Sequence, residues 1–207
     1  MKKYLKNTLF AAVLSTNLSL FADVPQPYAS VNNLPQMPYY VLDGWVFFNL
    51  INTFNAGVIV DVDSQDGSVA RYIAQQMPNL PSVKEIFSVS LWQSQDPSQK
   101  HLFQRFLSNI KQEGTAESIT PIRMSSLEGA SSLNIVADFV SVVGKNDENA
   151  IFNDIMAWYP HLSLTGVICG NNWHENSVQR GVARAASMLG LNLQISGNVW
   201  YFQKGSP

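Results

Sequence analysis

The residues best suited to ligand chemistry begin with the segment VDVDSQDGS at positions 60–68. It places two carboxylates, Asp61 and Asp63, in front of Gly67. Glycine allows a backbone to approach a ligand closely, and the start of a following helix offers free amides. The same carboxylates can instead cap the turn and the helix. The segment is therefore either one wall of a ligand site or a local structural cap.

The three histidines, His101, His161 and His174, form no His-Glu-x-x-His pattern, and the sequence has no Gly-x-Ser-x-Gly elbow or phosphate loop. His174 follows Asn-Asn-Trp at the expected carboxyl end of a strand, which is where open α/β sheets place their sites. It is the candidate catalytic residue, as a general base. The simpler interpretation is a surface histidine at a helix start.

The elements that must position these residues alternate between apolar runs and amphipathic segments, a pattern typical of a parallel sheet covered on both faces. Strands are predicted at residues 57–62, 83–90, 118–124, 134–143 and 162–170, and helices at 39–54, 67–77, 99–112, 146–159 and 175–189. Two last strands, 191–195 and 199–203, are separated by Ser-Gly-Asn, which suits a tight hairpin. We therefore expect an α/β fold with a crevice at the carboxyl ends of strands one, two and four.

The chain ahead of the predicted domain looks like an export signal followed by a linker. Residues 1–22 combine a basic start with a short apolar run, which is typical of a secretory signal peptide cleaved after Ala22. The alternative interpretation is a disordered or membrane-tethering N-terminus. Residues 23–38 hold four prolines with several Asn and Gln, a composition typical of a solvated linker. We expect a single domain over 39–207, a periplasmic or secreted location, and no transmembrane span in the mature chain.

The charge of the chain limits the classes of partner that are expected, and its cysteine content limits the disulfides that it can form. The formal net charge is −2, and beyond residue 22 the chain carries ten Lys or Arg against fifteen Asp or Glu. This acidic balance gives no electrostatic reason to expect nucleic acid as a partner. Cys169 is the sole cysteine, so no intramolecular disulfide can form. An unidentified small molecule or protein is the expected partner.

Residues 138–173, DFVSVVGKNDENAIFNDIMAWYPHLSLTGVICGNNW, resemble a stretch of the class I S-adenosylmethionine-dependent methyltransferases, especially their small bacterial members. The spacing agrees over a strand, a helix ending near Trp-x-Pro and the next strand, and the resemblance extends over about residues 40–204. It implies a Rossmann-like methyltransferase fold of about seven strands, mostly parallel, with a C-terminal antiparallel hairpin. It also implies S-adenosylmethionine as the cofactor of an active member.

The resemblance also assigns cofactor positions, and several carry unusual residues. Asp61 matches the acidic position of the family's glycine-rich turn and Gly67 its last glycine, but Asp63 stands at the first glycine. Its carboxylate should repel that of the cofactor, although it could meet the cofactor's amino group. Ser90 replaces the acid that binds both ribose hydroxyls, which leaves a weaker anchor. Ser125 is either an adenine contact or a helix cap supported by Glu128.

The metal-binding branch of the family uses an Asp after the fourth strand and an Asp-Asn pair after the fifth. Here Val143 and Asn171-Asn172 stand at those places, and the usual polar pair after the fourth strand becomes Lys145-Asn146. Neutral side chains bind magnesium poorly, so we expect no metal.

Taken together, the altered positions and the export signal favour a non-catalytic, exported methyltransferase-like protein with no cofactor expected. The alternative is an active S-adenosylmethionine-dependent methyltransferase on an unknown substrate. Most of the five tryptophans, Trp45 among them, should lie in the core. Only Trp92 and Trp173 fall beside the expected crevice, where they could stack on a planar ligand.

Overall fold

The computed structural model describes residues 25–36, 41–63, 65–93 and 101–205. The predicted signal peptide at 1–22 lies outside these ranges. Within the described residues, no helix has both the length and the apolar character needed to cross a membrane.

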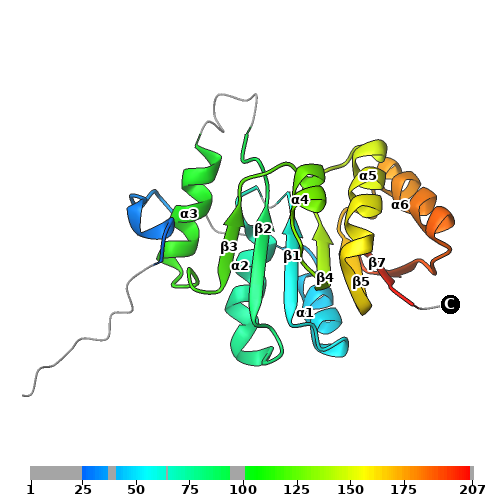
Figure 1. Cartoon of the computed structure of the whole chain (residues 1–207), viewed down its shortest axis with the longest axis horizontal. Coiled ribbons are helices and arrows are strands. Elements are labelled where there is room, and N and C mark those ends of the chain that lie inside the picture. The colour runs from blue at the N-terminus through cyan, green and yellow to red at the C-terminus, as the bar shows by residue number, and fades with distance from the viewer. Residues whose placement is uncertain (1–24, 37–40, 64, 94–100, 206–207) are drawn as a thin grey trace, which may run out of the picture.

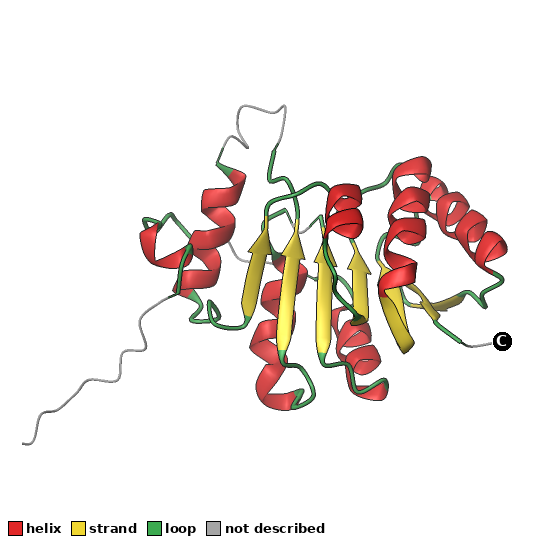
Figure 2. Cartoon of the chain, viewed as in Figure 1, coloured by secondary structure: helices red, strands yellow, loops and turns green. Residues whose placement is uncertain are grey.

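The described chain forms one seven-stranded sheet (Figures 1 and 2), in the order β3-β2-β1-β4-β5-β7-β6. The pairs from β3 to β5 are parallel, whereas β7 is antiparallel to β5 and to β6. This confirms the predicted mostly parallel sheet with a C-terminal hairpin. Its strands are β1 (Val58–Val62), β2 (Glu85–Val89), β3 (Ile119–Ile122), β4 (Ala137–Val142), β5 (Leu162–Gly170), β6 (Gln194–Ser196) and β7 (Val199–Gln203).

Helices cover both faces of the sheet (Figure 2). They are α1 (Gly44–Thr53), α2 (Ser68–Gln76), α3 (Leu102–Gln112), α4 (Ser126–Ser132), α5 (Glu148–Trp158) and α6 (Asn176–Leu189). Apolar side chains of α1, α2 and α3 form one core cluster with the sheet, and those of α4, α5 and α6 form another. Alternate strand residues serve the two sides: Ile59 packs in the first cluster, and Val60 and Val62 in the second. The sheet is therefore buried on both faces, as its apolar runs predicted.

The proline-rich segment is not solvated over its whole length. Tyr28, in the short 3-10 helix η1 (Tyr28–Ser30), is only 1% exposed, and its hydroxyl donates to the carbonyl of Ile119 at 2.6 Å. Nearby, Lys111 of α3 donates to the carbonyl of Val31 at 2.8 Å. The composition of the segment predicted a solvent-exposed linker. In the structure Tyr28 instead holds it against α3 and the edge strand β3.

Most predicted elements agree with the structure, and the differences lie at their ends. The N-terminal helix begins at Gly44 rather than near residue 39. Trp45, expected in the core, is 55% exposed on α1. The helix α4 was foreseen only through its cap at Ser125, because a seven-residue helix is too short to show a clear apolar period.

The Tyr28 contact predicts a measurable effect on stability. Tyr28→Phe removes the hydroxyl and leaves the carbonyl of Ile119 without that donor, so we expect the free energy of unfolding to fall by about 1–2 kcal/mol. Urea unfolding measures this loss. Tyr159→Phe is the control, because within the described residues the Tyr159 hydroxyl makes no hydrogen bond. Equal losses in both variants would show that the Tyr28 contact does not hold the segment.

Candidate functional site

The sheet order creates a crevice between β1 and β4. From β1 the chain leaves to α2 on one face, and from β4 it leaves to α5 on the other. Loops diverge at such a switch point, so the carboxyl ends of the two strands stay open to a ligand. The turn after β1 and the loops after β2, β3 and β4 therefore surround the candidate site.

The turn after β1 keeps a glycine-like backbone although it carries an aspartate. Asp63 has φ 58° and Gly67 has φ 79°, both in the left-handed region. Aspartate tolerates this region better than most residues do. At Gly67 there is also no room for a side chain, because a Cβ would lie 2.8 Å from the Phe106 ring. The unusual Asp63 thus preserves the turn that the resemblance implies.

Asp61 serves the sheet rather than the crevice. It is fully buried, and its Oδ1 accepts a hydrogen bond from Ser141 Oγ at 2.8 Å. Ser141 is its register partner on β4. The pair ties β1 to β4 beneath the turn, which fixes where Asp63 emerges.

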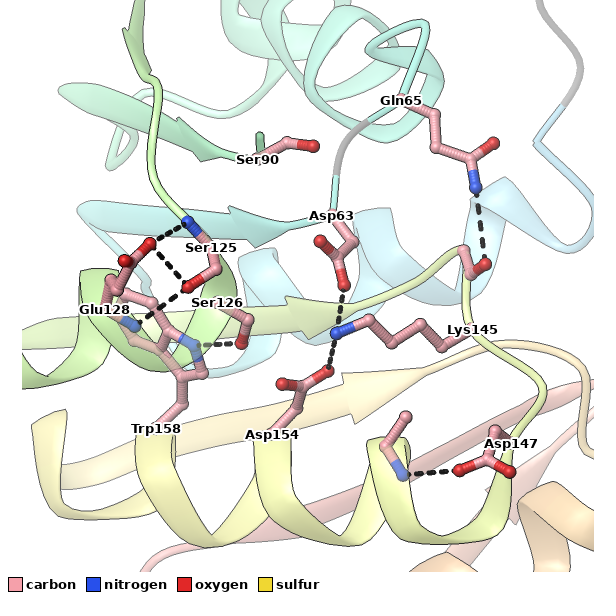
Figure 3. Close-up of polar contacts among 12 residues, drawn as sticks. Asp63, Gln65, Ser90, Ser125, Ser126, Glu128, Lys145, Asp147, Asp154 and Trp158 are labelled. Atoms are coloured by element: carbon pink, nitrogen blue, oxygen red, sulfur yellow. Dashed lines mark hydrogen bonds and ion pairs between the residues drawn. The ribbon is translucent and has the colours of Figure 1, made fainter. Parts of the chain in front are cut away.

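The side chain of Asp63 forms an ion pair with Lys145. The sequence analysis placed Lys145 after the fourth strand but did not predict that it contacts Asp63. Lys145 Nζ lies 2.6 Å from Asp63 Oδ2 and 3.0 Å from Asp154 Oδ2 on α5 (Figure 3). Burial raises the pKa of the Asp63 carboxyl above its usual value, although Lys145 lowers it. Burial opposes the charge of Lys145, but the two carboxylates together hold the pKa of its ammonium above the usual value. The Asp63 carboxylate is therefore paired with a charged lysine.

A hydrogen bond between Gln65 and Gly144 forms part of the floor of the crevice. Gln65 Nε2 donates to the carbonyl of Gly144 at 3.3 Å, which joins the turn after β1 to the loop after β4. A side chain at Gly144 would crowd this contact, since a Cβ there would lie 3.0 Å from Gln65 Nε2 and 3.0 Å from the Asp63 carbonyl oxygen. Asp63, Gln65 and Gly144 line both of the hollows described next, and so they form the ridge between them.

The first hollow, which we call the ribose lobe, has a volume of about 360 Å³ and lies at the ends of β1, β2 and β3. Its lining includes Asp63, Ser90, Trp92, Ser125 and Lys145. This volume is within the range of about 300–1,000 Å³ that small-molecule sites occupy. Three positions that the resemblance assigns to the cofactor therefore share one cavity.

Ser90 and its neighbour Trp92 shape the far side of the ribose lobe. Ser90 Oγ accepts a hydrogen bond from the Trp92 amide at 3.2 Å. Trp92 is 5% exposed, and its ring lies 4.9 Å from Phe103 and 4.6 Å from Phe106 between centroids. Most of the indole is thus packed against α3, and Trp92 forms part of the wall.

Ser125 caps α4, as one of its two interpretations predicted. Its side chain accepts from the Glu128 amide at 3.3 Å, and the Glu128 carboxylate accepts from the Ser125 amide at 3.0 Å (Figure 3). This is a capping box. It fixes the edge of the ribose lobe without removing Ser125 from its lining.

The second hollow, which we call the acceptor lobe, has a volume of about 280 Å³ and lies on the β4 and β5 side of the ridge. Besides the ridge residues, its lining includes Asp66, Val143, Asn171 and Asn172, together with apolar side chains from the start of α2 and from the segment ahead of α1. Asn172 Nδ2 donates to Asn146 Oδ1 at 2.8 Å. Within the described chain no three His, Cys, Asp or Glu side chains are grouped to hold a metal ion.

The candidate catalytic histidine lies outside both lobes. The His174 side chain is 63% exposed, and its Nδ1 lies 2.8 Å from Asn198 Oδ1. It precedes α6 by two residues, at the helix start that the simpler interpretation proposed. Trp173 is partly buried against the α4–α5–α6 core and likewise lines neither lobe.

Asp154 is the residue of this site that sequence reasoning missed. It is 1% exposed and stands on α5 nine positions after Lys145. A carboxylate on the buried side of a predicted helix was the available signal, since charged residues are rarely buried unless they are paired.

Comparison with known proteins identifies the fold. No protein-family model matches the chain, and no curated protein does either. Solved structures do match. One is a Staphylococcus aureus chain assigned as a caffeoyl-CoA O-methyltransferase, with TM-score 0.63, 12% identity, and 81% of this chain and 86% of that chain covered. The chain has the class I methyltransferase fold. The resemblance seen in the sequence is confirmed at the level of fold.

Two further structures of this fold contain a cofactor. TomG, an O-methyltransferase from Streptomyces achromogenes, was solved in complex with S-adenosylmethionine; it has TM-score 0.59 and 14% identity, with 83% of each chain covered. Cofactor-bound Rv0187 from MTB has TM-score 0.61 and 12% identity, with 84% of each chain covered.

These structures contradict the expectation that no cofactor is bound. That expectation treated Asp63 as an isolated carboxylate that would repel the cofactor. In the structure the Asp63 carboxylate is not isolated, because Lys145 lies 2.6 Å from it and offsets part of its charge.

The turn after β1 yields a prediction with a matched control. Gly67 and Gly114 both have positive φ, at 79° and 70°, but a Cβ at Gly114 meets nothing within 4 Å. Gly67→Ala should therefore cost about 1–3 kcal/mol more in unfolding free energy than Gly114→Ala, because it adds overpacking against Phe106 to the same backbone strain. Urea unfolding of both variants measures the difference. Equal costs would mean that Phe106 moves aside freely.

Proposed function

We propose that the ribose lobe binds S-adenosylmethionine and that the protein is a methyltransferase for a small acceptor held in the acceptor lobe. One observation carries the proposal. Asp63, Ser90 and Ser125, which lie far apart in the sequence, line a single cavity at the carboxyl ends of β1, β2 and β3. These are positions at which the sequence resemblance expects the cofactor. The solved structures of this fold that hold a cofactor support the same site.

The residues present fit the cofactor in distinct ways. Ser90 offers one hydroxyl to the ribose, and the buried Trp92 provides an apolar wall. The left-handed backbone at Asp63 keeps the turn open to the amino-acid end of the ligand. When bound, S-adenosylmethionine supplies a methyl group on a positively charged sulfur. The chain's own task is to hold that end of the ligand at the ridge, facing the acceptor lobe.

The acceptor lobe suits a small molecule without a metal bridge. Val143, Asn171 and Asn172 offer no charge there, and neutral oxygens hold magnesium weakly. The two carboxylates of the lining are already engaged, Asp63 with Lys145 and Asp66 with the Ser68 hydroxyl. We therefore propose that the acceptor is oriented by amide hydrogen bonds and apolar contact. The independence from metal stays a prediction that follows from these residue types.

Calorimetric titration of the folded domain tests the function. We expect S-adenosylmethionine and S-adenosylhomocysteine to bind with affinities of roughly 1–100 μM, because the ribose anchor is reduced to one hydroxyl while the rest of the lobe is present. No heat of binding up to millimolar ligand would overturn the proposal and favour a non-catalytic protein.

A gain of affinity provides a sharper test of the ribose lobe. Ser90→Asp restores an acid that accepts two hydrogen bonds from the ribose diol, so binding of S-adenosylhomocysteine should tighten roughly tenfold, or about 1.4 kcal/mol. Calorimetry measures the change. Ser90→Asn is the control of similar shape without charge, and it should gain much less. Unchanged binding in Ser90→Asp would place the ribose elsewhere.

Export also remains our proposal, supported by the basic start and apolar run of residues 1–22. The methyl donor is a cytoplasmic metabolite, so the place where the chain folds decides whether the crevice meets it. Sequencing the N-terminus of the protein from each cell fraction tests this, and an intact Met1 form confined to the cytoplasm would contradict export.

A further inference from the structure

We propose that Lys145 and Asp63 together bind the amino-acid end of the cofactor, with the Lys145 ammonium taking the ligand's carboxylate and the Asp63 carboxylate taking its amino group. This inference rests on the proposed function and assigns a role to Asp63, which stands at the first glycine of the family's turn, and to its ion-pair partner Lys145. Both side chains line the ribose lobe at the ridge, where the turn after β1 meets the loop after β4 (Figure 3).

The charges of this pair are complementary to an amino acid. The Lys145 and Asp63 side chains are 34% and 18% exposed, so each keeps part of its surface open to the lobe. Their charged atoms are 2.6 Å apart, a separation at which one ligand can reach both. A ligand carrying an ammonium and a carboxylate on one carbon presents the opposite charge to each member. Charge-assisted hydrogen bonds of this kind are about twice as strong as neutral ones.

Asp154 lowers the free-energy cost of moving Lys145 from Asp63 to the ligand carboxylate. It is 1% exposed and lies 3.0 Å from Lys145, on the side of α5. If Lys145 turns from Asp63 toward a ligand carboxylate, Asp154 still holds its ammonium in place. Asp63 then pairs with the ligand's amino group, so no buried charge is left alone, which would be costly. Asp154 is thus a positioning residue for Lys145.

The protonation state of Lys145 supports a binding role. The two carboxylates hold its pKa above the usual value, so it remains a cation at neutral pH. A lysine that is charged at neutral pH does not accept a proton from a methyl acceptor there, but it can bind an anion. The same geometry explains why an aspartate at the first glycine position is compatible with a cofactor site.

Two ligands separate the amino-acid end from the rest of the cofactor. S-adenosylhomocysteine carries the amino acid, and 5′-methylthioadenosine has the same adenosine and sulfur without it. We expect the unmodified protein to bind S-adenosylhomocysteine at least tenfold more tightly than 5′-methylthioadenosine, because only the former meets both charges. Calorimetry measures both affinities.

The decisive variant is Lys145→Met, which keeps length and removes charge. It should weaken S-adenosylhomocysteine roughly tenfold or more and change 5′-methylthioadenosine less than about threefold, so the preference between the ligands falls. Lys145→Arg, which restores the cation, should recover part of that preference. Lys84→Met removes an exposed lysine just ahead of β2, at the amino end of the strand and so at the opposite end from the crevice, and should leave both affinities unchanged.

The 5′-methylthioadenosine measurement also reports whether the variant is folded, since an intact ribose lobe still binds it. Equal affinity of the two ligands in the unmodified protein would overturn the inference while leaving the proposed function in place. A parallel loss of both ligands in Lys145→Met would also overturn it, by showing a structural role. If neither ligand binds the unmodified protein, the proposed function itself fails.

Discussion

The link from Asp63 through Lys145 to Asp154 is the interaction on which the architecture of the site depends. It joins the turn after β1, the loop after β4 and the helix α5 across the open end of the sheet (Figure 3). One cation between two carboxylates leaves a net negative charge at the crevice floor. Because the link is partly buried, salt screens it less than it would an exposed pair. The ridge it supports divides the crevice into two hollows.

The rest of the fold keeps this link in place. The Asp61–Ser141 hydrogen bond sets β1 against β4 below the turn, and the Phe106 ring under Gly67 fixes where α2 begins. Two apolar cores hold the helices on opposite faces, so the loops on either side of the switch point diverge. A site built from loops thus acquires rigidity from the strands that carry them. Asp63 has φ 58° in this turn, a left-handed backbone conformation that glycine adopts readily.

Much of the fold could be predicted from sequence because its signals are local. The apolar runs gave the strands, and the Ser-Gly-Asn spacing gave the hairpin of β6 and β7. The capping box at Ser125 was also readable, since its partner is three residues away. Prediction was less accurate where the structure depends on contacts between residues that are far apart in the sequence. Tyr28 is 91 residues from Ile119, and the 55% exposure of Trp45 depends on which face of α1 packs on the sheet.

The sequence by itself determined which residue types stand at the cofactor and metal positions, since those follow from order along the chain. It also determined that Asp63 brings a carboxylate where a glycine was expected. Only the tertiary structure decided what that carboxylate meets. Lys145 follows Asp63 by more than eighty residues, and Asp154 comes from the next helix, so their approach depends on the pairing of β1 with β4 and on the packing of α5. The electrostatic character of a residue is a property of its neighbours in space, and those neighbours are fixed only when the sheet is assembled.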